Sequence, residues 1–477
     1  MNNKNTISVD PLVSETAAYV HTAITLDEDT LAVAWLALFD ALGCAMASTR
    51  VQECMALVSP VFPEMVVNPG VHIVGTNYYV DPLTAAFGTG CLIRWLDFSD
   101  TWVALETGHP SDHIGTILAA AEFESRRRCV GRFEPYTLED VLHAMIKAYE
   151  IQGVLGLTNS ISGAGFDHAA FVRVPSAAVA TKLLGGGYDE ICSAVSHAWC
   201  DGHPLRIYRQ APNTGPRKSW AGPDASARGM QLALRALAGM PPCGTVLTDP
   251  RWGMEAVQFG GRSFAFSRPL ESYVMKNLLF KAAYPGVVHA QTALEAAIQL
   301  HPLVIDRLDD IKRINIWTYE TAIRITSKAG ALNNPADRDH CLQYMVAVGL
   351  LKGDLREEDF SDIASRDAHI DFLRAKMVVQ EDPRFTAGFL DPSIRSIANG
   401  LQITYLDGTA TARINIEQPV GHARRRAEGM PHLERKLQRN LNLCIPSYQA
   451  DRVMSIFGDR ERYLRMNVID FVKLFVL

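Results

Sequence analysis

The pattern of apolar and polar positions predicts mostly helices in the first half of the chain. Residues 31–48 are apolar on nearly every side, which is typical of a helix buried inside a core. Residues 138–155 follow Thr137, and its hydroxyl and the carboxylate of Asp140 can form a capping box at the first turn. Both segments are therefore expected to be long helices.

A third helix is predicted to begin at Pro175 and Ser176 and to stop at the three glycines 185–187. Consecutive glycines can cradle a phosphate, but no GxGxxG or GxxxxGK[ST] pattern surrounds these three, and no strand precedes them. They are better interpreted as a helix terminus followed by a turn.

The pattern changes after about residue 275. Residues 311–319 carry β-branched and aromatic side chains in partial alternation, which predicts a half-buried strand. Residues 401–418 contain two strand-like runs around Asp407 and Gly408, a pair that favours a two-residue hairpin turn. Helical patterns accompany these strands at residues 287–300 and 336–351.

These patterns predict a mainly α protein with a smaller α+β domain. A helical domain is expected over residues 1–275 and an α+β lid domain over residues 276–419. A last segment, residues 420–477, is expected to return to the helical domain, with its apolar end tucked into the core. Because 477 residues exceed what one hydrophobic core usually holds, two domains also agree with the length.

The near balance of acidic and basic residues argues against nucleic acid as a binding partner. The chain has 46 basic and 52 acidic side chains, a net charge of −6, whereas nucleic-acid binders need a concentrated basic surface. No nucleic-acid partner is therefore expected. The one dense basic run is interspersed with glutamates, so it is interpreted as a solvated helix face. It comprises Arg424, Arg425, Arg426, Arg435, Lys436 and Arg439.

The sequence carries no clear signal for membrane insertion, for export or for a metal site. No apolar stretch is judged to reach the roughly 20 residues that cross a bilayer, and the first residues lack a leader pattern. A membrane partner is therefore not expected, and the cytoplasm is the expected compartment. The nine cysteines are scattered without a CxxC, and the metal-like spacing of His197, Cys200 and His203 has no second ligand cluster. Neither a metal nor a cofactor is predicted.

The densest group of candidate catalytic side chains lies in a loop between two helix-like runs. It contains Asp97, Thr101 and His109, and loops held by rigid elements often carry catalytic groups. Further candidates are His168, Lys218 and Lys281. Lysine neutralises carboxylates and histidine moves protons, so this set suits a small polyanionic substrate.

Long strings of the sequence resemble the 2-methylcitrate dehydratase (MmgE/PrpD-type) family over essentially the whole chain. These strings are LDFSDTW with GHPSD, AYEIQGVLGLTNS, APNTGPRKSWAGPDASARG, ESYVMKNLLFK, LNNPADRDHCLQYMVA and PVGHARRR. The resemblance implies a large helical domain, a smaller α+β lid domain, an active site in the cleft between them, and a homodimer. It also implies a tricarboxylate substrate and catalysis without a cofactor.

The resemblance places seven residues in the active site: Asp97, Thr101, His109, His168, Lys218, Lys281 and Tyr344. The expected reaction is the dehydration of 2-methylcitrate or a related 2-alkylcitrate to the 2-alkyl-cis-aconitate, without a metal. We hypothesise that His109 and His168 form the acid–base pair, in an order left open, and that Asp97 orients one of them. Lys218 and Lys281 would bind carboxylates, and Tyr344 would donate a hydrogen bond from the lid.

Three alternatives remain open. The same pocket could decarboxylate cis-aconitate, which release of carbon dioxide would reveal. The chain could instead be a biosynthetic dehydratase for citrates with longer alkyl chains, as in fungal secondary metabolism. It could also bind a tricarboxylate without turning it over.

Overall fold

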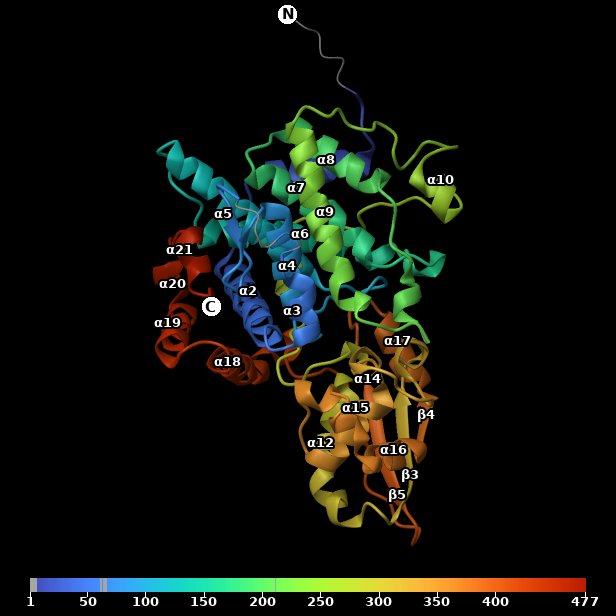
Figure 1. Cartoon of the computed structure of the whole chain (residues 1–477). Coiled ribbons are helices and arrows are strands. Elements are labelled where there is room, and N and C mark those ends of the chain that lie inside the picture. The colour runs from blue at the N-terminus through green and yellow to red at the C-terminus, as the bar shows by residue number, and fades with distance from the viewer. Residues whose placement is uncertain (1–6, 61, 63–66, 211) are drawn as a thin grey trace, which may run out of the picture.

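The computed structural model describes residues 7–60, 62, 67–210 and 212–477. Two large hydrophobic cores organise them: one contains residues from Leu12 to Ala282 and from Leu433 to Phe475, the other residues from Val287 to Tyr405. We name the parts around these cores the helical body and the α+β body (Figure 1). The prediction of a mainly α fold with a smaller α+β part is confirmed, whereas the domain boundaries at 275 and 419 stay predictions.

The predicted core helix is α2 (Glu28–Ser48), which lies in the middle of the helical body. It contacts α4 (Pro82–Arg94) on one side and α18 (Arg426–Asn442) on another. The expectation that no segment is long and apolar enough to cross a bilayer was wrong, because α2 meets both criteria. Since 83% of its most apolar window is buried within the protein, its apolarity is accounted for by the core.

The local signals at helix ends give a mixed result. In α6 (Leu138–Thr158) the capping box between Thr137 and Asp140 is present as predicted. The predicted start of the next helix was wrong: α7 (Ala169–Leu183) begins six residues before Pro175. The carboxylate of Asp167 accepts a hydrogen bond from the Ala169 amide at 3.1 Å and so begins the helix earlier.

The end of α7 agrees with the prediction. Gly185 has φ +92°, and the Gly186 amide donates to the Thr181 carbonyl at 2.8 Å. This left-handed turn ends the helix, as a glycine after the last helical residue commonly does. The next helix, α8 (Tyr188–Cys200), starts directly afterwards.

The α+β body contains a four-stranded sheet in the order β4-β3-β5-β6. The predicted strand at 311–319 is β3 (Ile311–Thr318), parallel to β4 (Met377–Glu381) and antiparallel to β5 (Asn399–Tyr405). The edge strand β6 (Ile414–Ile416) pairs with β5. Helix α12 (Gln291–Val304) contacts β5 and β6, and α15 (Leu342–Lys352) packs against α12.

The hairpin between β5 and β6 is confirmed, but its turn is not the predicted two-residue type. The Tyr405 amide donates to Thr409 O at 2.8 Å, and the Gly408 amide donates to Tyr405 O at 3.1 Å. Three residues therefore form the loop, and only Gly408 among them has positive φ, at +86°. A two-residue type I′ turn would need positive φ at both central residues, and Asp407 does not adopt it.

The C-terminal segment returns to the helical body. Helices α18 and α19 (Ser447–Gly458) contact α2, and α21 (Val468–Lys473) contacts α5 (Ile114–Val130) and α6. Figure 1 shows these helices in red beside the blue α2. Phe471 and Phe475 are fully buried, so the apolar chain end does lie in the core.

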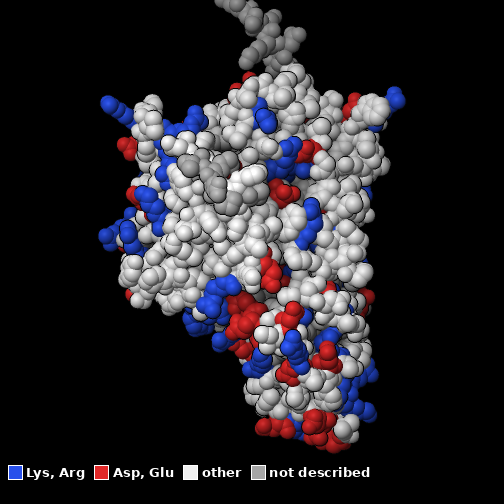
Figure 2. Space-filling model, viewed as in Figure 1, with Lys and Arg blue, Asp and Glu red and all other residues white. Residues whose placement is uncertain are grey.

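The interpretation of the basic run as a solvated face holds for Arg424 and Arg435, which are exposed, but was wrong for Lys436. Lys436 is only 5% exposed, and its ammonium lies 2.7 Å from Asp40 in α2 and donates to the Phe98 carbonyl at 2.6 Å. Arg425 pairs with Glu295 of α12 at 2.9 Å. These cations join the C-terminal segment to both bodies, and Figure 2 shows acidic and basic side chains side by side where the bodies meet.

The close contact of α4 with α5 yields a stability prediction. A Cβ at Gly115 would lie 2.4 Å from Ala86 O and 2.7 Å from Gly90 N, both rigid backbone atoms. We expect Gly115→Ala to destabilise the protein by about 1–3 kcal/mol and to lower its melting temperature in a calorimetric scan. Gly163→Ala is the control, since a Cβ there meets nothing within 4 Å. Equal melting temperatures for the two variants would contradict this packing.

Candidate active site

A cavity of about 140 Å³ lies where the helical and α+β bodies meet. Its lining residues include one aspartate, one lysine and four histidines that could take part in proton transfer: Asp97, His109, His168, Lys281, His289 and His340. Four of these were predicted from the sequence. The lining residues come from loops that are distant in the sequence and belong to both bodies. The cavity therefore forms only when the two bodies pack against each other.

The loop from Asp97 to His109 is held in place by backbone pairing. Thr101 pairs with Leu279, and Trp102 pairs with Gly108, as isolated antiparallel bridges. The Asp97 backbone adopts φ +48°, which is strained for a residue with a side chain. Strain of this kind persists where the surrounding structure fixes the residue, and it is frequent at functional sites.

The Asp97 carboxylate is 1% exposed and lies among three cations. Arg94 Nη1 is 2.7 Å away and Lys281 Nζ 2.5 Å away, both at Oδ1, while Lys218 Nζ is 3.8 Å from Oδ2. Burial acts to raise the pKa of Asp97, but Arg94 and the two lysines hold it well below its usual value. Asp97 is therefore ionised and serves as the anionic centre of the cluster.

The α+β body supplies a second carboxylate to this cluster. Asp339 follows the short helix α14 (Pro335–Arg338) and accepts from Lys218 Nζ at 2.7 Å through both oxygens. His340 Nδ1 lies 2.6 Å from Asp339 and 3.5 Å from Asp97. Lys218 stands at the start of α9 (Arg217–Leu237) in the helical body, so this pair links the two bodies.

Asp97, Asp339 and His340 place their ligand-type atoms within 4.8 Å of one another, a spacing that a metal ion could use. Ammonium groups already occupy the carboxylate oxygens: Lys281 on Asp97 and Lys218 on Asp339. A divalent cation would have to displace these lysines from a fully buried position. We therefore interpret the group as an ion-pair network.

His109 is buried, and its Nδ1 lies 2.9 Å from the Asp100 carbonyl and 3.4 Å from the Thr101 hydroxyl. A carbonyl only accepts hydrogen bonds, so Nδ1 carries the proton and Nε2 keeps its lone pair. Burial, together with Arg94 and Lys281, lowers the pKa of His109 well below its usual value. His109 is thus a neutral imidazole whose Nε2 carries a lone pair.

His168 stands directly before α7, and its ring centroid is 5.9 Å from that of His109. Its Nδ1 lies 3.6 Å from the Asp167 carboxylate, and its Nε2 has no hydrogen-bond partner among the described residues. Burial lowers the pKa of His168 to about 3. His168 is therefore neutral, and its Nε2 faces no protein partner among the described residues.

Arginines give the cavity a positive wall. Arg209 pairs with Asp167 through two nitrogens, and Arg206 has a buried Nη1 without a hydrogen-bond partner among the described residues. Both come from the turn η3 (Arg206–Arg209) and line the cavity. The Glu106 carboxylate on the same wall is engaged by the backbone amides of residues 161 and 162, both at 3.0 Å.

Asp97, His109, His168 and Lys281 line the cavity together, whereas the other three predicted residues lie elsewhere. Lys218 is behind Asp97, and Thr101 is beneath His109. The structure does not bring Tyr344 into this group. Its hydroxyl donates to the Asp359 carbonyl at 2.6 Å, inside the core of the α+β body. Tyr344 is therefore left out of the site.

Asp339 and His340 were not predicted from the sequence, although both stand in the string LNNPADRDHCLQYMVA that carries the resemblance. That string contains several polar residues, and its letters do not say which side chain faces the cavity. Arg94 and Arg206 were also missed. Neither has a local motif, because only folding brings them to the cluster.

Comparison with known proteins places the chain in context. The model of the MmgE/PrpD N-terminal domain matches residues 14–267, and that of the MmgE/PrpD C-terminal domain matches residues 284–457. The two matches together cover most of the chain.

Relatives match over nearly their full length. The 2-methylcitrate dehydratase of Escherichia coli K12 is 47% identical over 443 residues, covering 92% of each chain. The mitochondrial 2-methylcitrate dehydratase of Yarrowia lipolytica is 42% identical, covering 98% of this chain and 91% of its own. The 2-methylcitrate dehydratase-like protein oryR of Aspergillus oryzae is 41% identical, covering 92% and 90%. By its two family-model matches and these identities, this chain belongs to the MmgE/PrpD family.

Proposed function

We propose that this protein is a hydro-lyase that eliminates water from 2-methylcitrate to give 2-methyl-cis-aconitate. The reaction breaks a C–H bond beside a carboxylate and the C–O bond on the neighbouring carbon, and a C=C bond forms. The observation that carries the proposal is a cavity between the two bodies that pairs two neutral imidazoles with a buried ammonium. The names of the relatives support the same substrate.

The charges around the cavity suit a tricarboxylate. Four arginines line it in addition to Lys281, namely Arg206, Arg209, Arg324 and Arg395. The two carboxylates on its wall, Asp97 and Glu106, are already engaged by protein groups. Arg206 is the best placed to bind a substrate carboxylate, because its buried Nη1 has no hydrogen-bond partner among the described residues.

His109 is the proposed base. Its Nδ1 proton is committed to the Asp100 carbonyl, so Nε2 is free to take the proton from the substrate carbon. The orientation of His168 toward Asp167 also leaves a lone pair on its Nε2. Both imidazoles can therefore accept a proton, but neither has one to give to the leaving hydroxyl. We replace the hypothesis that the two histidines form an acid–base pair with one in which another group is the acid.

Lys281 is the proposed acid. Two of its three N–H groups donate to the Asp97 carbonyl at 2.8 Å and the Asp97 carboxylate at 2.5 Å, which leaves the third for the substrate. Burial lowers the pKa of Lys281 to about 8, so it is protonated at neutral pH and close to the ideal strength for a proton donor. It would protonate the departing hydroxyl.

The first test is an ultraviolet assay of the conjugated alkene formed from 2-methylcitrate, in the presence of a chelator. We expect steady product formation that the chelator does not reduce, because side chains supply both proton transfers. Loss of activity with chelator, restored by a divalent ion, would overturn the metal-free proposal. Carbon dioxide release from cis-aconitate without dehydration would favour the decarboxylase alternative. The compartment and the homodimer remain predictions.

The assignment of the base predicts that His109→Ala loses about 10²–10⁴-fold in kcat, as general bases typically contribute. Single-turnover kinetics with 2-methylcitrate would measure this loss apart from binding. His369→Ala is the matched control, because that histidine is 64% exposed and pairs only with the surface residue Asp367. A kcat within a few-fold of wild type for His109→Ala would refute the assignment.

The assignment of the acid predicts a distinctive pH profile at saturating substrate. No loss of kcat is expected around the ordinary histidine pKa, because burial keeps the pKa of His168 at about 3 and that of His109 well below its usual value. On the alkaline side kcat should fall with an apparent pKa of about 8, as the Lys281 ammonium loses its proton.

Lys281→Arg separates acid catalysis from simple carboxylate binding. Arginine keeps the positive charge but does not release a proton at these pH values. We expect this variant to lose about 10²-fold or more in kcat and to show no alkaline fall. Wild-type kcat in Lys281→Arg would mean that Lys281 only binds substrate.

A further inference from the structure

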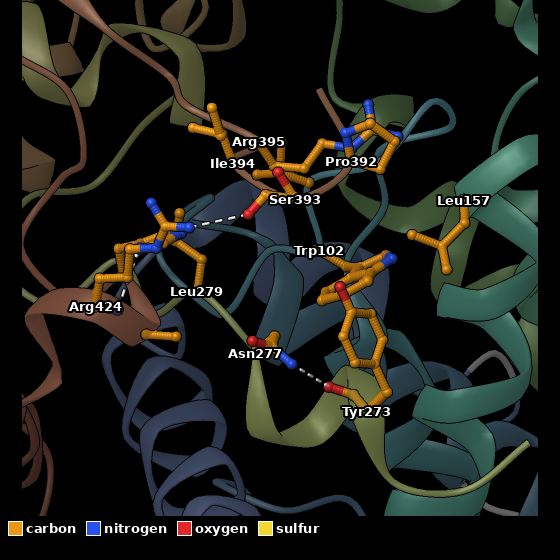
Figure 3. Close-up of a pocket in the computed structure, with 13 residues that line it drawn as sticks. Trp102, Leu157, Tyr273, Asn277, Leu279, Pro392, Ser393, Ile394, Arg395 and Arg424 are labelled. Atoms are coloured by element: carbon orange, nitrogen blue, oxygen red, sulfur yellow. Dashed lines mark hydrogen bonds between the residues drawn. The ribbon is translucent and has the colours of Figure 1, made fainter. Parts of the chain in front are cut away.

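A second cavity, of about 90 Å³, is shown in Figure 3, and it shares the lining residue Arg395 with the catalytic cavity. Trp102 and Tyr273 form its inner wall, with Leu157 beside them, and the loop residues Pro392 to Arg395 lie across from these rings. Trp102 Nε1 donates to the Gly153 carbonyl at 3.0 Å, so the indole is fixed in place. No aspartate or glutamate is among the residues that line this cavity.

Arg395 lines both cavities and separates them. The segment from Trp102 to Leu105 also borders both cavities. Trp102 and Val103 line the second cavity, and Ala104 and Leu105 line the catalytic one. The two spaces thus lie on either side of one extended segment and one guanidinium. One wall of the space beyond Arg395 is apolar and contains Trp102, Val103 and Leu157, whereas the opposite side includes the polar residues His422 and Arg424.

The Arg395 side chain is held only weakly. Its Nη1 donates to the Phe389 carbonyl at 3.4 Å, and its buried Nε has no hydrogen-bond partner among the described residues. Its backbone, by contrast, is fixed at a strained φ of +45°, with its amide donating to Asp391 O at 2.8 Å. Arg424 also fixes the loop by donating to the Ser393 carbonyl at 2.9 Å. A strained backbone that positions a loosely held side chain is typical of a functional residue.

We propose that Arg395 determines the length of the alkyl group on C2 of the substrate, by closing the passage from the catalytic cavity into the second one. This inference rests on the proposed function. A cavity of about 150 Å³ holds a benzene ring, so the catalytic cavity of about 140 Å³ is already small for a tricarboxylate and offers no space for a longer alkyl chain. Such a chain must extend elsewhere, and the second cavity, with its apolar wall of Trp102, Val103 and Leu157, is the adjoining space.

With arginine at this position, a long chain would press its methylenes against a desolvated cation. Removal of the side chain joins the two cavities and exposes the chain to Trp102, Val103 and Leu157 instead. In apolar pockets a single methylene typically changes kcat/KM by about 10–200-fold. The wild-type protein should therefore favour the methyl substrate, and the shortened variant should favour a longer one.

The experiment compares kcat/KM for synthetic 2-methylcitrate and 2-hexylcitrate in wild type, Arg395→Ala and Asn277→Ala. The last is a control, since Asn277 lines the second cavity but its side chain donates to the Tyr273 carbonyl and makes no hydrogen bond to the Arg395 loop among the described residues. We expect the hexyl-to-methyl ratio to rise at least about tenfold in Arg395→Ala and to stay unchanged in Asn277→Ala. Arg395→Lys, which restores a long cationic side chain, should return the ratio toward wild type.

A parallel loss on both substrates in Arg395→Ala would overturn the inference, because it would make Arg395 a simple carboxylate ligand. A series of alkyl lengths on the wild-type protein needs no variant, and activity there should fall sharply beyond the shortest chains. Equal wild-type turnover of methyl and hexyl substrates would also overturn the inference. Wild-type inactivity on every 2-alkylcitrate would instead refute the proposed function itself.

Discussion

The buried carboxylate of Asp97 is the constraint around which the site is built. An ionised group without water needs partners of opposite charge, and removing one partner of a buried ion pair typically costs about 3–5 kcal/mol. Arg94 comes from the helix just before Asp97, Lys218 from the start of α9, and Lys281 from the chain that leads into the α+β body. Satisfying this one charge therefore fixes three distant segments relative to one another.

The same network relates the two bodies. Lys218 is shared between Asp97 in the helical body and Asp339 in the α+β body, so the position of His340 depends on a contact across the junction. The Lys436 ammonium donates to the carbonyls of Phe98 and Lys281, on the two segments that carry the site. The positions of the proposed catalytic groups thus depend on Lys218 and Lys436, neither of which lines the cavity.

Local signals predicted much of the fold, and one of the errors comes from an interaction between distant segments. The capping box at Thr137 needs only neighbouring residues, so that helix start was predictable. The burial of Lys436 depends on Asp40, which is distant in the sequence. The early start of α7 is different, because Asp167 accepts from an amide only two residues away and this local signal was overlooked. In the site, the loop with Asp97 and His109 is continuous in the sequence and could therefore be predicted from its motif.

Tyr344 and His340 show where a motif stops being informative. They are four residues apart in one string, yet His340 precedes α15 and faces the cavity, while Tyr344 lies within that helix and faces the core. A motif identifies a segment of the active site, but the direction in which each residue of that segment points decides which side chain reaches the cavity. That direction was not evident, because α15 is apolar on almost every side.

The return of the C-terminal segment has a consequence for synthesis on the ribosome. The core of the α+β body is drawn from one continuous stretch, Val287 to Tyr405, and is complete before the last helices are translated. The core of the helical body begins at Leu12 but also contains residues from Leu433 to Phe475. The helical body is therefore synthesised first but completes its core last, and α2 has no contact with α18 until α18 has been translated. Nascent chains halted before residue 433 would expose this apolar helix to chaperones.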